Sequence, residues 1–252
     1  MAMSNTDTDR PDAPHTPAEA AEAVKQEARF GATFLRVHSW RLLLVFVGLL
    51  LPLWGFGALV EDLHEGEVFA FDPPVLQMAH AMASAGFDRV FVVMSALGYL
   101  YGVVPADVLL VLVLALRRRF REGLFAGIAM VGAALLNVAA KHSFARARPS
   151  LWESIAPETT FSFPSGHAMG SMTLAWVAVL LCWHTRWRWP VIAAAVVFTL
   201  LVGLSRIYLG VHYPSDILAG WAAASVWTVG VYGLVFYGTL RPWQKRAPKG
   251  TG

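Results

Sequence analysis

Three short motifs in the second half of the chain combine cationic residues, histidines and a carboxylate at fixed spacing. In chain order they are Lys141 with Arg148-Pro149, the tetrapeptide Pro164-Ser165-Gly166-His167, and Ser205-Arg206 followed by His212 and Asp216. At average residue usage, a given tetrapeptide such as Pro-Ser-Gly-His arises by chance roughly once in 10⁵ positions. The ordered set therefore points to one chemical site rather than to coincidence.

The cations Lys141, Arg148 and Arg206 suit the binding of phosphate. Phosphoryl transfer spreads negative charge over the equatorial oxygens, so its catalysis consists mainly of positioning and charge stabilisation. Many phosphatases supply the balancing charge with metal ions. Here three side chains can supply it, and the arginines can form forked hydrogen bonds to phosphate oxygens. We therefore expect a phosphate site without a metal ion or another cofactor.

Ser165 and Gly166 stand where a helix is expected to begin. The free N–H groups and the dipole at such an end favour an anion, and a glycine lets the backbone approach it closely. Taken alone, this pair would more often be a helix cap. The adjacent His167 and the other motifs favour a phosphate contact.

His212 and Asp216 lie four residues apart, across a helix start that Pro214 indicates. If the helical turn forms, the carboxylate can hold the imidazole in one tautomer. The alternative is a purely structural hydrogen-bonded pair. Spacing alone does not decide whether His167 or His212 would be a nucleophile.

The composition indicates a membrane protein. Hydrophobic residues make up 56% of the 252 residues and charged residues only 15%, against about 25% in an ordinary soluble domain. The net charge of +3 is too modest to suggest nucleic-acid binding. Because roughly 20 apolar residues span a bilayer core, we expect six spans. They cover residues 42–60, 97–116, 124–140, 167–183, 189–204 and 215–237.

The basic residues that flank the predicted spans outside the motifs fall on one side of such a six-span bundle. They are Arg36, Arg41, Arg117, Arg118, Arg119, Arg121, Arg186, Arg188, Arg241, Lys245, Arg246 and Lys249. That side is expected to be cytoplasmic, with both termini, so the three motifs lie on the outer face. Lys141 and Arg148 could instead be interfacial anchors, although that interpretation is weaker on an outer face.

The expected fold is all-α: a six-transmembrane helix bundle with a short amphipathic extramembrane helix between the first two spans. Val75, Met78, Ala79 and Met82 have the spacing of that short helix. Residues 1–38 form a polar N-terminal tail with a possible interfacial helix. Residues 39–240 form the six-span domain, and residues 241–252 a basic cytoplasmic tail.

In its three motifs the sequence resembles the type 2 phosphatidic acid phosphatase family, which shares its phosphate site with bacterial non-specific acid phosphatases and vanadium haloperoxidases. The resemblance covers about residues 97–237 and fills every signature position. It implies that His212 attacks phosphorus, that Asp216 orients His212, and that His167 protonates the leaving oxygen and then activates water. It also implies phosphate binding by Lys141, Arg148, Ser165, Gly166 and Arg206.

The function implied is an integral-membrane lipid phosphatase of a bacterial inner membrane that works through a phosphohistidine. Phosphatidic acid, phosphatidylglycerol phosphate and undecaprenyl pyrophosphate are all candidate substrates. A lipid-to-lipid phosphotransferase and a phospholipid transporter or flippase stay open as alternatives, while a haloperoxidase would need vanadate. Asp107, His142 and Arg146 have no assigned role, the last two being substrate contacts or surface residues. The oligomeric state is open too.

Overall fold

The computed structural model describes residues 22, 25, 39–40, 42–65, 69–236 and 242–243. All regular structure within these residues is helical, as the sequence predicts. The chain divides into a unit of residues 1–44 and a unit of residues 45–252, and the site lies in the second. The predicted tails, with the interfacial helix, lie outside the described residues apart from isolated positions.

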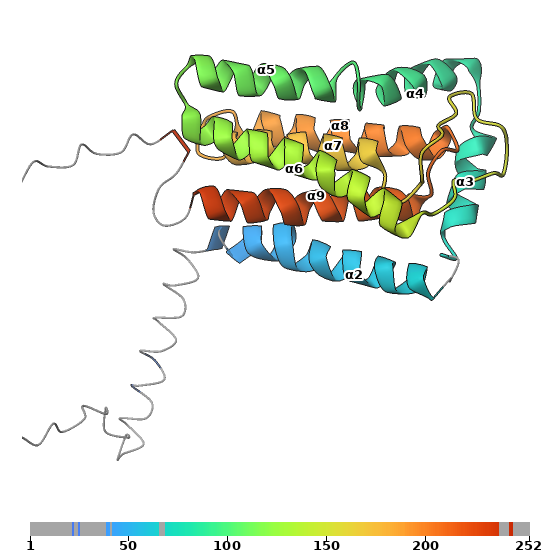
Figure 1. Ribbon diagram of the computed structural model, residues 1–252, viewed down its shortest axis with the longest axis horizontal. Coiled ribbons are helices and arrows are strands. Elements are labelled where there is room, and N and C mark those ends of the chain that lie inside the picture. Colours follow the sequence, from blue (N-terminus) through green and yellow to red (C-terminus); the bar gives the residue numbers. More distant parts are fainter. Residues whose placement is uncertain are drawn as a thin grey trace, which may run out of the picture. The chain divides into compact units, whose positions relative to one another are not determined.

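The second unit is a bundle built around α7 (Figure 1). Its elements are η1 (Phe46–Leu50), α2 (Leu51–His64), α3 (Asp72–Ala81), α4 (Ala85–Leu97), α5 (Val103–Leu116), α6 (Phe120–Phe144), α7 (Gly166–Cys182), α8 (Arg188–Tyr208) and α9 (Pro214–Val235). Helix α7 packs against α6, α8 and α9, while α2 packs against α9, α4 against α8, and α5 against α6. The helices that begin or end at the three motifs, α6, α7, α8 and α9, therefore pack together.

Four helical stretches are long and apolar enough to cross a bilayer, which fits a membrane protein. They are Leu42–His64, Phe120–Phe144, Arg188–Tyr208 and Pro214–Val235. Two shorter apolar helices, Val103–Leu116 and Gly166–Cys182, accompany them. Five of the six predicted segments coincide with one of these helices to within a few residues, which is the usual precision for helix ends.

The second predicted segment, residues 97–116, has the wrong start. Helix α5 begins only at Val103, and a separate helix, α4, precedes it where no helix was predicted. Gly102 permits the tight turn between the two helices, because a Cβ atom there would lie 2.1 Å from the carbonyl oxygen of Leu97. Ser84 caps α4, its side chain accepting a hydrogen bond from Phe87 N. The second pass of the chain through the bundle is therefore made by two helices.

Helix α3 lies where the short helix was predicted, but its buried side differs from the predicted apolar face. Asp72, Leu76 and Ala79 are buried, whereas Met78 and Met82 are 62% and 50% exposed. The apolar residues of this segment fit two overlapping helical faces, and packing against α8 and α9 selects the one that contains Leu76. The same face brings the carboxylate of Asp72 to the start of α9.

Polar side chains between the helices fix how α6 and α7 lie against α9. Trp176 of α7 donates to Ser225 Oγ at 2.8 Å, and Trp227 Nε1 of α9 donates to the carbonyl oxygen of Ala129 on α6 at 3.0 Å. The ring of Trp227 occupies the space that a side chain on Gly132 would need. Because buried polar groups are costly when unpaired, these bonds favour one register of the helices.

Candidate active site

The predicted site residues gather at one end of the bundle. Lys141 is in the last turn of α6, His167 in the first turn of α7, and Arg206 in the last turn of α8. His212 lies in the short link before α9. The N–H of Ser165 donates to the carbonyl oxygen of Asp216 at 3.1 Å, which ties the start of α7 to the start of α9.

His212 and Asp216 form the predicted pair. The imidazole Nδ1 lies 3.3 Å from Asp216 Oδ2, and both side chains are almost fully buried. The same carboxylate accepts hydrogen bonds from Tyr213 N at 2.8 Å and from the Ser162 hydroxyl. Burial lowers the pKa of His212 to about 4, against the opposing effect of Asp216. His212 is therefore neutral near pH 7, with Nε2 facing away from the carboxylate.

Arg148 contacts the other imidazole nitrogen, Nε2. Its NH1 atom is 3.1 Å from His212 Nε2 and donates to the carbonyl oxygen of Val211 at 2.7 Å. The rest of the guanidinium bonds to the carbonyl and hydroxyl of Thr160, at 2.6 and 2.9 Å. Burial lowers the pKa of Arg148, although an arginine stays cationic at neutral pH. The loop thus holds this charge rigidly against the histidine.

Arg206 is 1% exposed, an unusual position for an arginine. Its NH1 atom donates to Ser95 Oγ of α4, and its NH2 atom pairs with the carboxylate of Glu158. Within the described residues its buried Nε atom has no hydrogen-bond partner. That atom is a donor available to a bound anion.

Glu158, which the sequence did not single out, carries the anion at the centre of the site. Its carboxylate pairs with Arg206, lies 2.7 Å from Arg148 NH2, and is 3.8 and 4.0 Å from the imidazoles of His167 and His212. Burial raises the pKa of Glu158, but the surrounding positive groups, Arg206 foremost, outweigh it and hold the pKa below its usual value. Side chains from all three motif regions therefore converge on one negative group.

The remaining predicted phosphate contacts lie at the edge of this cluster. Lys141 Nζ donates to the carbonyl oxygen of Phe161. Ser165 caps α7 by accepting from Ala168 N at 3.4 Å, which is the helix-cap alternative, so a phosphate contact from Ser165 stays a prediction. The N–H groups of Gly166 and His167 belong to the first turn and have no partner within the helix.

Arg146 and Asp72 complete the support of the pair. Arg146 donates to Asp216 Oδ1 at 2.5 Å and to Asp72 Oδ2 at 3.0 Å. Asp72 also accepts from Ser215 N at 2.9 Å. The interpretation of Arg146 as a surface residue is therefore wrong. Its place within the first motif gave no sign of a second carboxylate more than seventy residues earlier.

Two further residues, His142 and Asp107, have no assigned role in this cluster. His142 is exposed, with its ring edge against Phe161 at 5.9 Å between centroids. Asp107 lies in α5, where its Oδ1 atom is buried and has no hydrogen-bond partner within the described residues.

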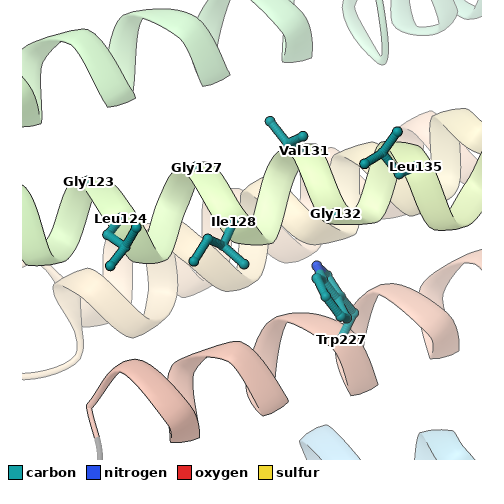
Figure 2. Close-up of a pocket in the computed structure, with 8 residues that line it drawn as sticks. All are labelled: Gly123, Leu124, Gly127, Ile128, Val131, Gly132, Leu135 and Trp227. Atoms are coloured by element: carbon teal, nitrogen blue, oxygen red, sulfur yellow. The ribbon is translucent and has the colours of Figure 1, made fainter.

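A separate apolar groove runs along α6, away from the site. Figure 2 shows Trp227 of α9 facing Gly132, with aliphatic side chains of α6 along the groove. Its lining consists of Gly123, Leu124, Gly127, Ile128, Val131, Gly132, Leu135 and Trp227. Because the lining offers hydrocarbon and almost no polar group, the groove is unsuited to phosphate and differs in kind from the charged cluster.

Comparisons with known proteins agree with the motifs. The model of the PAP2 superfamily matches residues 122–240. The undecaprenyl-diphosphatase of Sulfolobus acidocaldarius is 28% identical over 195 residues, which cover 75% of this chain and 87% of that protein. Phosphatidylglycerophosphatase B of Bacillus subtilis is 28% identical over 172 residues, covering 66% and 84%.

A solved structure shows the same architecture. The crystal structure of the transmembrane PAP2-type phosphatidylglycerolphosphate phosphatase from Bacillus subtilis superimposes with a TM-score of 0.65 at 26% identity. The superposition covers 73% of this chain and 94% of that chain.

Fold and site together define a helical membrane phosphatase, an enzyme that hydrolyses phosphate esters of lipids. The part of the chain that matches the PAP2 superfamily, residues 122–240, contains all three motifs, in agreement with the resemblance that they indicated.

Proposed function

We propose that this enzyme hydrolyses a lipid phosphomonoester or pyrophosphate through a phosphohistidine on His212, with side chains in place of a metal ion. One observation carries the proposal. Arg148, Arg206, His167 and His212 converge on a single anionic group, the carboxylate of Glu158, as they would on a phosphate.

In the first step, His212 Nε2 attacks phosphorus. The geometry supports this nitrogen, because Asp216 engages Nδ1 and thereby leaves the lone pair on Nε2. Arg148 NH1 lies 3.1 Å from Nε2 and has to turn to the phosphate when Nε2 attacks. The bond between phosphorus and the lipid oxygen breaks as the N–P bond forms. A protonated His167 gives its proton to the departing oxygen, and the arginines stabilise the charge on the transferring group.

In the second step, His167 acts as a base. It accepts a proton from water, whose oxygen attacks phosphorus, and the N–P bond breaks to release inorganic phosphate. His212 returns to its neutral form, still bonded to Asp216. The N–H groups of Gly166 and His167 and the Lys141 ammonium are further donors for phosphate oxygens in both steps.

The substrate is a lipid whose headgroup ends in phosphate or diphosphate. The relatives named above are an undecaprenyl-diphosphatase and phosphatidylglycerophosphatases, and both kinds of headgroup fit a cluster of three cations. Phosphatidic acid belongs to the same chemical class. The charged site at one end of apolar helices suits a headgroup whose chains stay in the bilayer.

The proposed topology has six crossings, the second made by α4 and α5 together. Arg117, Arg119, Arg121 and Arg186 lie where α5 meets α6 and α7 meets α8, at the end of the bundle opposite the site. The positive-inside rule then puts that end in the cytoplasm, with both termini. The site faces outward from the inner membrane, where undecaprenyl carrier lipids would be recycled.

The test is phosphate release from a panel of lipid phosphates and pyrophosphates by the detergent-purified protein in EDTA. His212→Ala is the inactive variant, and His184→Ala is the matched control because His184 is exposed near the opposite end. Release that survives EDTA and is lost only in His212→Ala supports the proposal. Absence of release from every lipid by folded protein contradicts it. Phosphate transfer to a second lipid that exceeds release would favour a phosphotransferase.

A further inference from the structure

Glu158 occupies the place in this site where a substrate phosphate has to bind. Its carboxylate uses the NH2 atoms of both Arg148 and Arg206. It also lies within 4.0 Å of Nε2 of His212, the atom that would attack phosphorus. A carboxylate and a phosphate cannot both hold these donors, so binding of substrate requires Glu158 to leave.

The positive charge of Arg148 and Arg206 explains why a carboxylate lies there. Arg148 and Arg206 are largely buried, with side chains only 12% and 2% exposed, and burying cations without a counter-charge is costly. Glu158 supplies that counter-charge when no substrate is bound. Once a phosphate has entered, two anions would share the site, and their repulsion favours departure of the weaker one.

The surroundings of Glu158 allow such a departure. It belongs to the stretch between α6 and α7, outside any helix, and its neighbours Pro157 and Thr159 are exposed. Its side chain is 28% exposed, which is more than the side chain of any residue with which it pairs. It can therefore rotate toward solvent without rearranging a helix.

We infer that Glu158 is a specificity-determining residue, an internal carboxylate that competes with the substrate phosphate for Arg148 and Arg206. This inference rests on the proposed function, because it assumes that the cluster binds phosphate. A group with two negative charges displaces the carboxylate more readily than a singly charged headgroup does, so the enzyme selects terminal phosphates over diester headgroups.

The experiment measures the binding of inorganic phosphate by calorimetry. It also measures the inhibition constant of inorganic phosphate for the hydrolysis of a lipid phosphate substrate. Glu158→Gln keeps the shape and removes the charge, so phosphate should bind about tenfold more tightly, and KM should fall. Glu153→Gln, an exposed change in the same loop, should leave both constants unchanged. Glu158→Asp, whose shorter side chain reaches the arginines less well, should also tighten phosphate binding.

The outcomes separate this inference from the proposed function. Unchanged or weaker phosphate binding in folded Glu158→Gln and Glu158→Asp, with normal binding by the unaltered enzyme, overturns only the role of Glu158. A fall in kcat without tighter phosphate binding would make Glu158 a catalytic or supporting residue and overturn the inference too. Absence of both phosphate binding and lipid hydrolysis in the unaltered enzyme would overturn the proposed function itself.

Discussion

Arg146 NH1 lies 2.5 Å from Asp216 Oδ1, and the other end of the same guanidinium lies 3.0 Å from Asp72 Oδ2. One arginine thus joins the first turn of α3 to the first turn of α9, with both carboxylates completely buried. Since Asp216 in turn holds His212, the orientation of the proposed nucleophile depends on a residue that does not touch it.

Arg146→Ala is therefore expected to lower kcat by about 10²-fold with a smaller change in KM, because a slight displacement of a reacting group is costly. Steady-state kinetics on a hydrolysed lipid phosphate measure the split. Arg89→Ala, an exposed arginine on α4, is the control and should behave as the unaltered enzyme. An Arg146→Ala enzyme that kept full kcat would show that Asp216 needs no such support.

Asp216→Asn is expected to lower kcat on the order of 10³-fold to 10⁴-fold. An amide can still accept the hydrogen bond from Tyr213 N, but it no longer enforces the tautomer with a proton on Nδ1. The kcat of the purified variant, with its helix content checked by circular dichroism, tests this role. Loss of less than about tenfold would argue for a merely structural pair.

Arg206→Lys is expected to lower kcat/KM about 10²-fold, since a lysine cannot reproduce the forked contacts to Ser95 and an anion. Arg188→Lys, at the start of α8 and exposed, is the matched control. The kcat/KM of both variants is measured on the same lipid phosphate. Equal kcat/KM values would mean that positive charge alone is needed at position 206.

The protonation of His212 gives a prediction about pH. Burial lowers its pKa to about 4, so the neutral form should persist at about pH 5.5, where an ordinary imidazole is mostly protonated. Nitrogen-15 NMR of histidine-labelled protein in detergent reports the charge, with His212→Ala used to assign the signal. A midpoint near 6.5 would contradict the burial of this imidazole.

The sequence predicted the helices and the motif residues for physical reasons that act locally. Apolar segments of sufficient length and prolines at helix starts, such as Pro214, depend on residues close together in the chain. Helix α4 was missed although Ser84 is a recognisable cap, and only its last residue, Leu97, fell within a predicted span.

The residues that support the arginines of the site could not be predicted from local sequence patterns. Asp72, Ser95 and Glu158 meet Arg146, Arg206 and Arg148 only after α3, α4 and the loop before α7 have packed. No spacing rule joins positions so far apart. A buried arginine needs a counter-charge, but its identity is decided by tertiary structure.

The most direct test of the account is to trap the phosphoenzyme. The enzyme is mixed with a lipid phosphate carrying a labelled terminal phosphate, quenched in alkali, and digested for mass spectrometry. The account predicts label on His212 in the unaltered enzyme and none in His212→Ala. Label on another residue, or continued hydrolysis by His212→Ala, would contradict it.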